Sequence, residues 1–177
     1  APDTNTVSAT ISLGVAVYHL LDGAEVDRVC ACTASGLVAI NPATNSAGSA
    51  VSGGTGSTVL YQVVVVGAEL WGTSGGVAQY LKRFSLLAAP AYVGEYDVAL
   101  EAGAGPDTLC YDATNDRVWI SYWTANKMKV VTRGTGVVHT TFNTGTTPNA
   151  GPPRWIAAYN GAVYTTHTTG RIARWDG

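Results

Sequence analysis

The stretch NDRVWISYWTANKMKVVTR, residues Asn115–Arg133, contains two apolar segments separated by a short polar turn. The segments Arg117–Tyr122 and Lys127–Thr132 are rich in β-branched and aromatic residues, which favours two β-strands. The same pattern occurs in three other places, as VDRVCACTASGLVAIN, AELWGTSGGVAQYLKRF and GAVYTTHTTGRIARWDG. The sequence therefore predicts a β-structure built from a repeated unit.

The repeat has a nearly constant length. If Cys30, Trp71, Trp119 and Tyr164 are equivalent, successive units are separated by 41, 48 and 45 residues. A unit of four antiparallel strands that recurs every 40 to 50 residues or so is typical of β-propeller blades. We therefore expect a single all-β domain over residues 1–177, a β-propeller of about four blades.

The order of features within a unit supports this interpretation. A unit contains, in order, an apolar strand, a turn with Asn or Asp, Val-Trp or Val-Tyr, and a further apolar strand. This order resembles the blades of the YVTN, NHL and streptogramin-lyase-like propellers. The resemblance covers about residues 15–175. For the last group it implies an enzyme in which a turn histidine, here His167, acts as general base beside a metal held by loop carboxylates.

The number of blades leaves alternatives open. Four units are visible, whereas the similar families usually close with six or seven blades. The fourth unit ends after its third strand, and the alternating segment Thr4–Leu13 has no partner nearby. We predict that residues 4–11 complete the last blade, which would remove an exposed sheet edge. The alternatives are two chains that form eight blades, part of a larger propeller, and a β-sandwich.

Composition limits the function classes. Only 12% of the residues are charged and the net charge is −2, so nucleic acid is not an expected partner. A surface rich in hydroxyl and amide groups favours an extracellular or virion-surface location. No run of about 18 apolar residues is present, so we expect no membrane insertion. We interpret Cys30, Cys32 and Cys110 as buried free thiols.

Candidate ligand-binding residues come from two sets of loops that gather on one face of a propeller. Aromatic rings and hydroxyl groups on such a face can bind a sugar or a peptide. The candidates in the turns after the second strands are Thr33, Ser74, Tyr122, Trp123 and His167. The candidates in the connections between blades are Ser57, Asp107 and Arg154.

Two alternative interpretations accompany these candidates. Tyr122 and Trp123 can instead pack between blades, as we expect for Trp71 and Trp119 inside their strands. His19, His139 and His167 fall in different strands of their units, so we predict no shared metal site.

The sequence favours a non-catalytic binding or structural module, for example in a phage tail or virion or as a secreted recognition domain. Its partners would be proteins of an assembly, a surface glycan or further copies of the chain. The alternatives are a carbohydrate-binding propeller and a streptogramin-lyase-like metal-dependent enzyme. No nucleophile turn or phosphate-binding loop is present, so we predict no catalytic residues and no cofactor.

Overall fold

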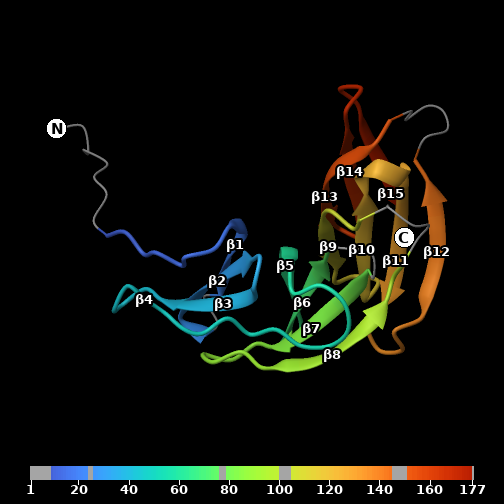
Figure 1. Cartoon of the computed structure of the whole chain (residues 1–177). Helices are drawn as coiled ribbons and strands as arrows, with labels where there is room; N and C mark the ends of the chain where they lie inside the picture. Colours follow the sequence, from blue (N-terminus) through green and yellow to red (C-terminus); the bar gives the residue numbers. More distant parts are fainter. Residues whose placement is uncertain (1–8, 24–25, 76–78, 100–104, 145–150, 177) are drawn as a thin grey trace.

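The computed structural model describes residues 9–23, 26–75, 79–99, 105–144 and 151–176. In these residues the chain forms four antiparallel sheets, which are the blades of a β-propeller (Figure 1). Blade 1 contains β1 (Val17–Gly23), β2 (Arg28–Thr33), β3 (Gly36–Asn41) and β4 (Ser46–Ala47). Blade 2 contains β5 (Leu60–Val66), β6 (Glu69–Ser74), β7 (Tyr80–Ser85) and β8 (Tyr92–Asp97).

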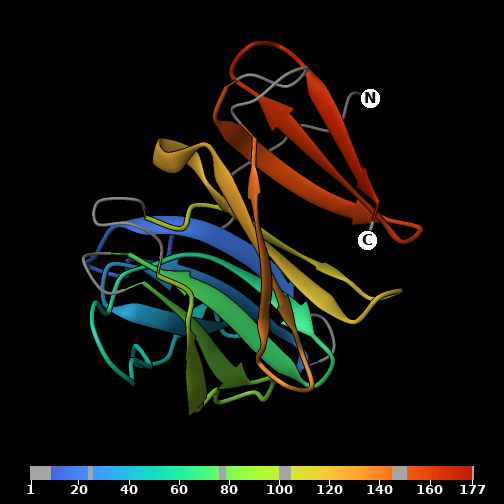
Figure 2. The same ribbon diagram turned by 90° about the vertical axis from the view of Figure 1, so that its right-hand side faces the viewer.

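Blade 3 contains β9 (Leu109–Asp112), β10 (Arg117–Tyr122), β11 (Lys127–Thr132) and β12 (Val138–Asn143), with a 3-10 turn at Trp123–Ala125. Blade 4 contains β13 (Pro153–Tyr159), β14 (Ala162–His167) and β15 (Ile172–Asp176). Within every blade, strands adjacent in the sequence are hydrogen-bonded neighbours. The blades follow one another in chain order, with blade 1 and blade 4 at the two ends of the series (Figures 1 and 2).

The structure confirms the predicted repeat, because the four residues taken as equivalent occupy the same position in their blades. Cys30, Trp71, Trp119 and Tyr164 are each the third residue of the second strand of their blade. Trp71 and Trp119 are almost completely buried, with 0% and 1% of their surfaces exposed, so they are packing residues as expected. The period of the sequence and the period of the structure are therefore the same.

Each blade is a sheet with two apolar faces. We call the face toward the next blade the trailing face, and it carries the third residue of the second strand. The opposite, leading face carries the second and fourth residues. Trp71 on the trailing face of blade 2 lies in one cluster with Leu109, Val118 and Ile120 on the leading face of blade 3. Equivalent clusters surround Cys30 between blades 1 and 2, and Trp119 between blades 3 and 4.

Polar contacts reinforce these apolar interfaces. The ammonium groups of two equivalent lysines, Lys82 in β7 and Lys129 in β11, donate hydrogen bonds to the connection that arrives from the blade before. The acceptor of Lys129 is the Ala99 carbonyl, and Lys82 donates to the carbonyls of Gly53, at 2.7 Å, and Ser57, at 2.9 Å. Both lysine side chains are buried, and these hydrogen bonds give their ammonium groups partners inside the fold.

Turns between first and second strands use residues suited to positive φ. Asn160 and Gly161 have φ values of 49° and 73°, as the tight turn between β13 and β14 requires. Asp116 has a φ of 53° and accepts a hydrogen bond from the Tyr111 hydroxyl at 2.7 Å. Asp112 accepts one from the Thr114 backbone at 3.1 Å. These aspartates therefore shape turns, as the sequence indicated.

The N-terminal segment is only partly described. Residues 4–8 of the predicted closing strand lie outside the described residues. Ala9–Ile11 belongs to no strand, and Ile11 and Leu13 pack against Ala31, Val38 and Ile40 on the leading face of blade 1. The described sheet of blade 4 has three strands. The predicted closing strand, residues 4–11, is therefore not formed at its described residues Ala9–Ile11, and its part at 4–8 stays a prediction.

Blade 1 has a short outer strand, Ser46–Ala47, and Val51 forms a separate bridge with Leu37. Cys30, Cys32 and Cys110 are buried free thiols, as predicted. No helix among the described residues is long and apolar enough to cross a bilayer.

Replacement of the trailing-face tryptophan should strongly destabilise the domain. We expect Trp119→Ala to lower the free energy of unfolding by about 3–5 kcal/mol, because it leaves a cavity between blades 3 and 4. Trp123→Ala is the matched control, since Trp123 is 38% exposed and its loss should cost less than about 1 kcal/mol. Urea unfolding followed by circular dichroism measures both, and equal losses would contradict the packing role of Trp119.

Candidate functional site

The first strands of successive blades pack beside one another and surround the propeller axis. β1 is adjacent to β5, β5 to β9, and β9 to β13. A cavity of about 180 Å³ lies among them, and all four blades or their approaches contribute to its lining. The lining residues are Tyr18, His19, Tyr61, Gln62, Asp107, Thr108 and Trp155.

Three aromatic rings form part of the cavity wall. Tyr18 of β1 and Tyr61 of β5 contact each other edge to face, with ring centroids 5.4 Å apart. Trp155 of β13 is 65% exposed, although it is one of the largest apolar side chains in the chain. Exposed aromatic faces beside a cavity are available to stack on a planar or ring-shaped ligand.

Backbone-linked hydrogen bonds fix the polar part of the wall. The Gln62 side-chain oxygen accepts a hydrogen bond from the Leu109 backbone at 3.0 Å, which ties blade 2 to blade 3. The hydroxyl groups of Thr108 and Ser121 are hydrogen-bonded at 2.7 Å. Because hydrogen bonds within the fold fix the side chains of Gln62 and Thr108, this part of the wall is organised before any ligand binds.

Asp107 brings a carboxyl group to the cavity. Its backbone donates a hydrogen bond to the Ser121 carbonyl at 2.9 Å, which fixes the chain just before β9. Burial raises the pKa of the Asp107 carboxyl, and the nearby Arg154 guanidinium partly opposes this rise. The carboxyl group can therefore serve as a hydrogen-bonding group for a polar ligand.

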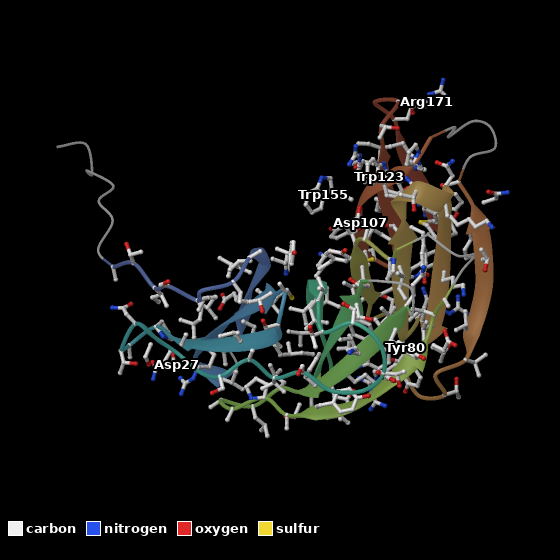
Figure 3. All side chains as sticks on the ribbon, viewed as in Figure 1. Asp27, Tyr80, Asp107, Trp123, Trp155 and Arg171 are labelled. Carbon is white, nitrogen blue, oxygen red and sulfur yellow. The ribbon has the colours of Figure 1, made fainter. Side chains whose placement is uncertain are left out.

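Arg154 also contacts Trp123. Its guanidinium carbon lies 4.0 Å from the centre of the Trp123 ring, in the range of a cation–π interaction. Figure 3 shows Trp123, Asp107 and Trp155 near one another at this end of the axis. The structure thus brings together three of the residues singled out from the sequence, namely Trp123, Asp107 and Arg154.

The other sequence candidates lie elsewhere and are used by the fold. Thr33, Ser74, Tyr122 and His167 are the equivalent sixth residues of the second strands, and all four are buried. Thr33 and Ser74 donate to the carbonyls of Gly36, at 2.9 Å, and Tyr80, at 3.1 Å. The Tyr122 hydroxyl donates to the Val98 carbonyl at 2.6 Å.

His167 is held at both ring nitrogens. Nδ1 lies 3.0 Å from the Gly151 carbonyl, which can only accept, so this nitrogen carries the proton. Nε2 lies 2.8 Å from the Thr165 hydroxyl. The imidazole therefore joins β14 to the approach to β13. The described residues contain no group of three or more His, Cys, Asp or Glu side chains that could hold a metal ion.

Six lining residues were not predicted from the sequence, five on the first strands and one beside them. They are Tyr18, His19, Tyr61, Gln62, Thr108 and Trp155. A signal was present in Tyr61-Gln62, which brings polar groups into the otherwise apolar segment 60–66. A second signal was Trp155, which directly follows the candidate Arg154.

Comparison with solved structures agrees with the propeller fold. The chain is similar to the β-propeller domain of Cps50 (Swd1) from Myceliophteria thermophila, with a TM-score of 0.71 and 13% identity, over 98% of this chain and 58% of that one. It is similar to the computationally designed protein Ika4, with a TM-score of 0.68 and 12% identity, over 98% of this chain and 100% of that one.

A third similar structure is that of a catalytically inactive virginiamycin B lyase from Staphylococcus aureus with quinupristin. Its TM-score is 0.61 and its identity 13%, over 92% of this chain and 56% of that one. The chain thus spans little more than half the length of two of these three propellers. No known family matches the sequence, and no curated protein is similar to it in sequence. These likenesses establish the fold.

His19 should make the domain sensitive to acid. Its Nδ1 atom is buried and has no hydrogen-bond partner among the described residues, and burial lowers the pKa of the imidazole below its ordinary value of 6.5. As the pH falls from 7 to 5, the unfolded chain takes up this proton more readily, so the free energy of unfolding should fall. His19→Phe should remove part of that loss in urea unfolding at several pH values. An unchanged pH dependence would contradict this role.

Proposed function

We propose that this protein is a binding module that recognises a small polar ring, such as one sugar residue, at its axial cavity. One observation carries the proposal: a single cavity is lined by side chains from all four blades, and they combine aromatic rings with fixed polar groups. That combination suits sugars, which present apolar ring faces and hydroxyl groups together.

The size of the cavity limits the ligand. Its volume of about 180 Å³ is below the range of roughly 300–1,000 Å³ that is usual for ligand pockets. A ligand would therefore insert one ring or one group while the rest remains outside. Trp155 would stack on its apolar face, and Asp107 and Gln62 would bond its hydroxyl groups.

The rim adds a charged contact outside the cavity. Arg154 lies over Trp123 and beside Asp107, so its guanidinium is already oriented by two neighbours. It could bond a second sugar residue or an acidic group of a longer glycan. Because Arg154 is solvent-exposed, this contact would tune affinity more than it would determine the ligand class.

The geometry does not favour the enzymatic alternative. The general base implied by the resemblance, His167, is buried and both of its ring nitrogens already have partners within the fold. A virion or secreted location rests on composition alone, in particular on the 12% share of charged residues.

Glycan-array screening followed by titration of the best glycan tests the proposal. Trp155→Ala and Asp107→Asn should each weaken binding about tenfold or more, which corresponds to about 1.4 kcal/mol. Asp107→Asn keeps the size of the side chain and removes its charge, so a loss would report hydrogen bonding and not shape.

Tyr159→Ala is the matched control for this titration. Tyr159 lies on β13 with Trp155 and is similarly exposed, at 69%, but it does not line the cavity. Its replacement should leave the affinity unchanged. Failure of every glycan to bind, or equal affinity of the wild type and Trp155→Ala, would reject the proposed function.

A further inference from the structure

The two blades at the ends of the series present apolar faces that the described residues cover only in part. On blade 1, Ile11 and Leu13 cover Ala31, Val38 and Ile40. On the leading face of blade 1, the exposed fractions of Val17 and Leu20 are 45% and 60%. On the trailing face of blade 4, Trp155, Tyr159 and Ile172 are 65%, 69% and 71% exposed. Among the described strands, none of blade 4 packs against a strand of blade 1 as closely as β1 packs against β5 or β9 against β13.

The blade repeat identifies what each face normally contacts. Leu20, which pairs with the fourth residue of β2, is equivalent to Val63, Leu109 and Ile156 in the other blades. Those three side chains are 0%, 1% and 9% exposed, and each lies in one cluster with the third residue of the preceding second strand. The three pairs are Cys30 with Val63, Trp71 with Leu109, and Trp119 with Ile156.

Tyr164 continues this series on the trailing face of blade 4. It is the third residue of β14, and its cross-strand neighbours Ala157 and Arg174 lie on the same face. The face opposite, with Ile156 and Val163, is the one that packs against blade 3. Tyr164 therefore points to the position that a following blade would take.

We propose that this position is taken by blade 1 of a second copy of the chain. Tyr164 of each copy then packs against Leu20 of the other, and the two chains together form an eight-bladed ring. The contact continues the three blade interfaces already present within each chain, with the same equivalent residues on both sides. Each copy supplies one exposed leading face and one exposed trailing face. A closed ring of two copies therefore covers both exposed faces of each copy.

The shape of the blade 1 surface agrees with this occupant. A groove of about 790 Å³ on blade 1 is lined by apolar side chains that include Ile11, Leu13, Val17, Leu20 and Ile40. The groove therefore offers a largely apolar surface to Tyr164 of the second copy. This inference does not depend on the proposed ligand.

Native mass spectrometry and sedimentation of the chain test the inference. The expected mass is twice the 18.3 kDa of one chain. Leu20→Glu and Tyr164→Lys each place a charge in both copies of the interface, so each variant alone should be a monomer. Mixed together, they should form a dimer with one chain of each kind, because one interface is then wild type and the other pairs Glu with Lys.

Val93→Glu is the control for adding a charge at an exposed apolar position. Val93 is 49% exposed and lies on β8, away from both end faces, so this variant should remain a dimer. A monomeric wild type, an open-ended series of larger masses, or a mixture of the two variants that stays monomeric would overturn the proposal.

Discussion

Burial of both faces of each blade is the constraint on which the rest of this structure depends. A blade of three or four strands carries apolar side chains on both sides, so no blade can bury its core alone. The third residue of each second strand meets the leading face of the next blade, and this one contact is repeated with Cys30, Trp71 and Trp119. Stability is therefore largely a sum of interfaces between neighbours, as in repeat proteins.

The sequence was sufficient to predict the strands and their repeat because those signals are local. Alternation along a strand and turn residues such as Asn160-Gly161 act over a few positions, so they survive without knowledge of the partner strand. The sequence leaves the outer strand of blade 1 undefined. Its Gly- and Ser-rich segment has no alternation to define a register, and the edge strand pairs on one side only.

The candidate site was harder to predict because it depends on which strand lies innermost. Alignment placed Thr33, Ser74, Tyr122 and His167 at equivalent turns, and that equivalence is correct. A polar side chain at a strand end can, however, donate a hydrogen bond to a nearby backbone carbonyl. All four of these side chains do so. The axial residues come from three first strands and from the approach to β9, which meet only in three dimensions. Apart from Trp155, the residues of the cavity differ from those on the exposed end faces of blades 1 and 4.

The two equivalent lysines have a consequence for how the chain folds. Lys82 and Lys129 each reach back to carbonyl groups of the connection that precedes their own blade. A newly made blade can therefore satisfy its buried ammonium group only when the preceding blade and connection are already in place. Blade 1 has Val38 at this position and needs no such predecessor. The order in which the blades mature would then follow the order in which a ribosome delivers them.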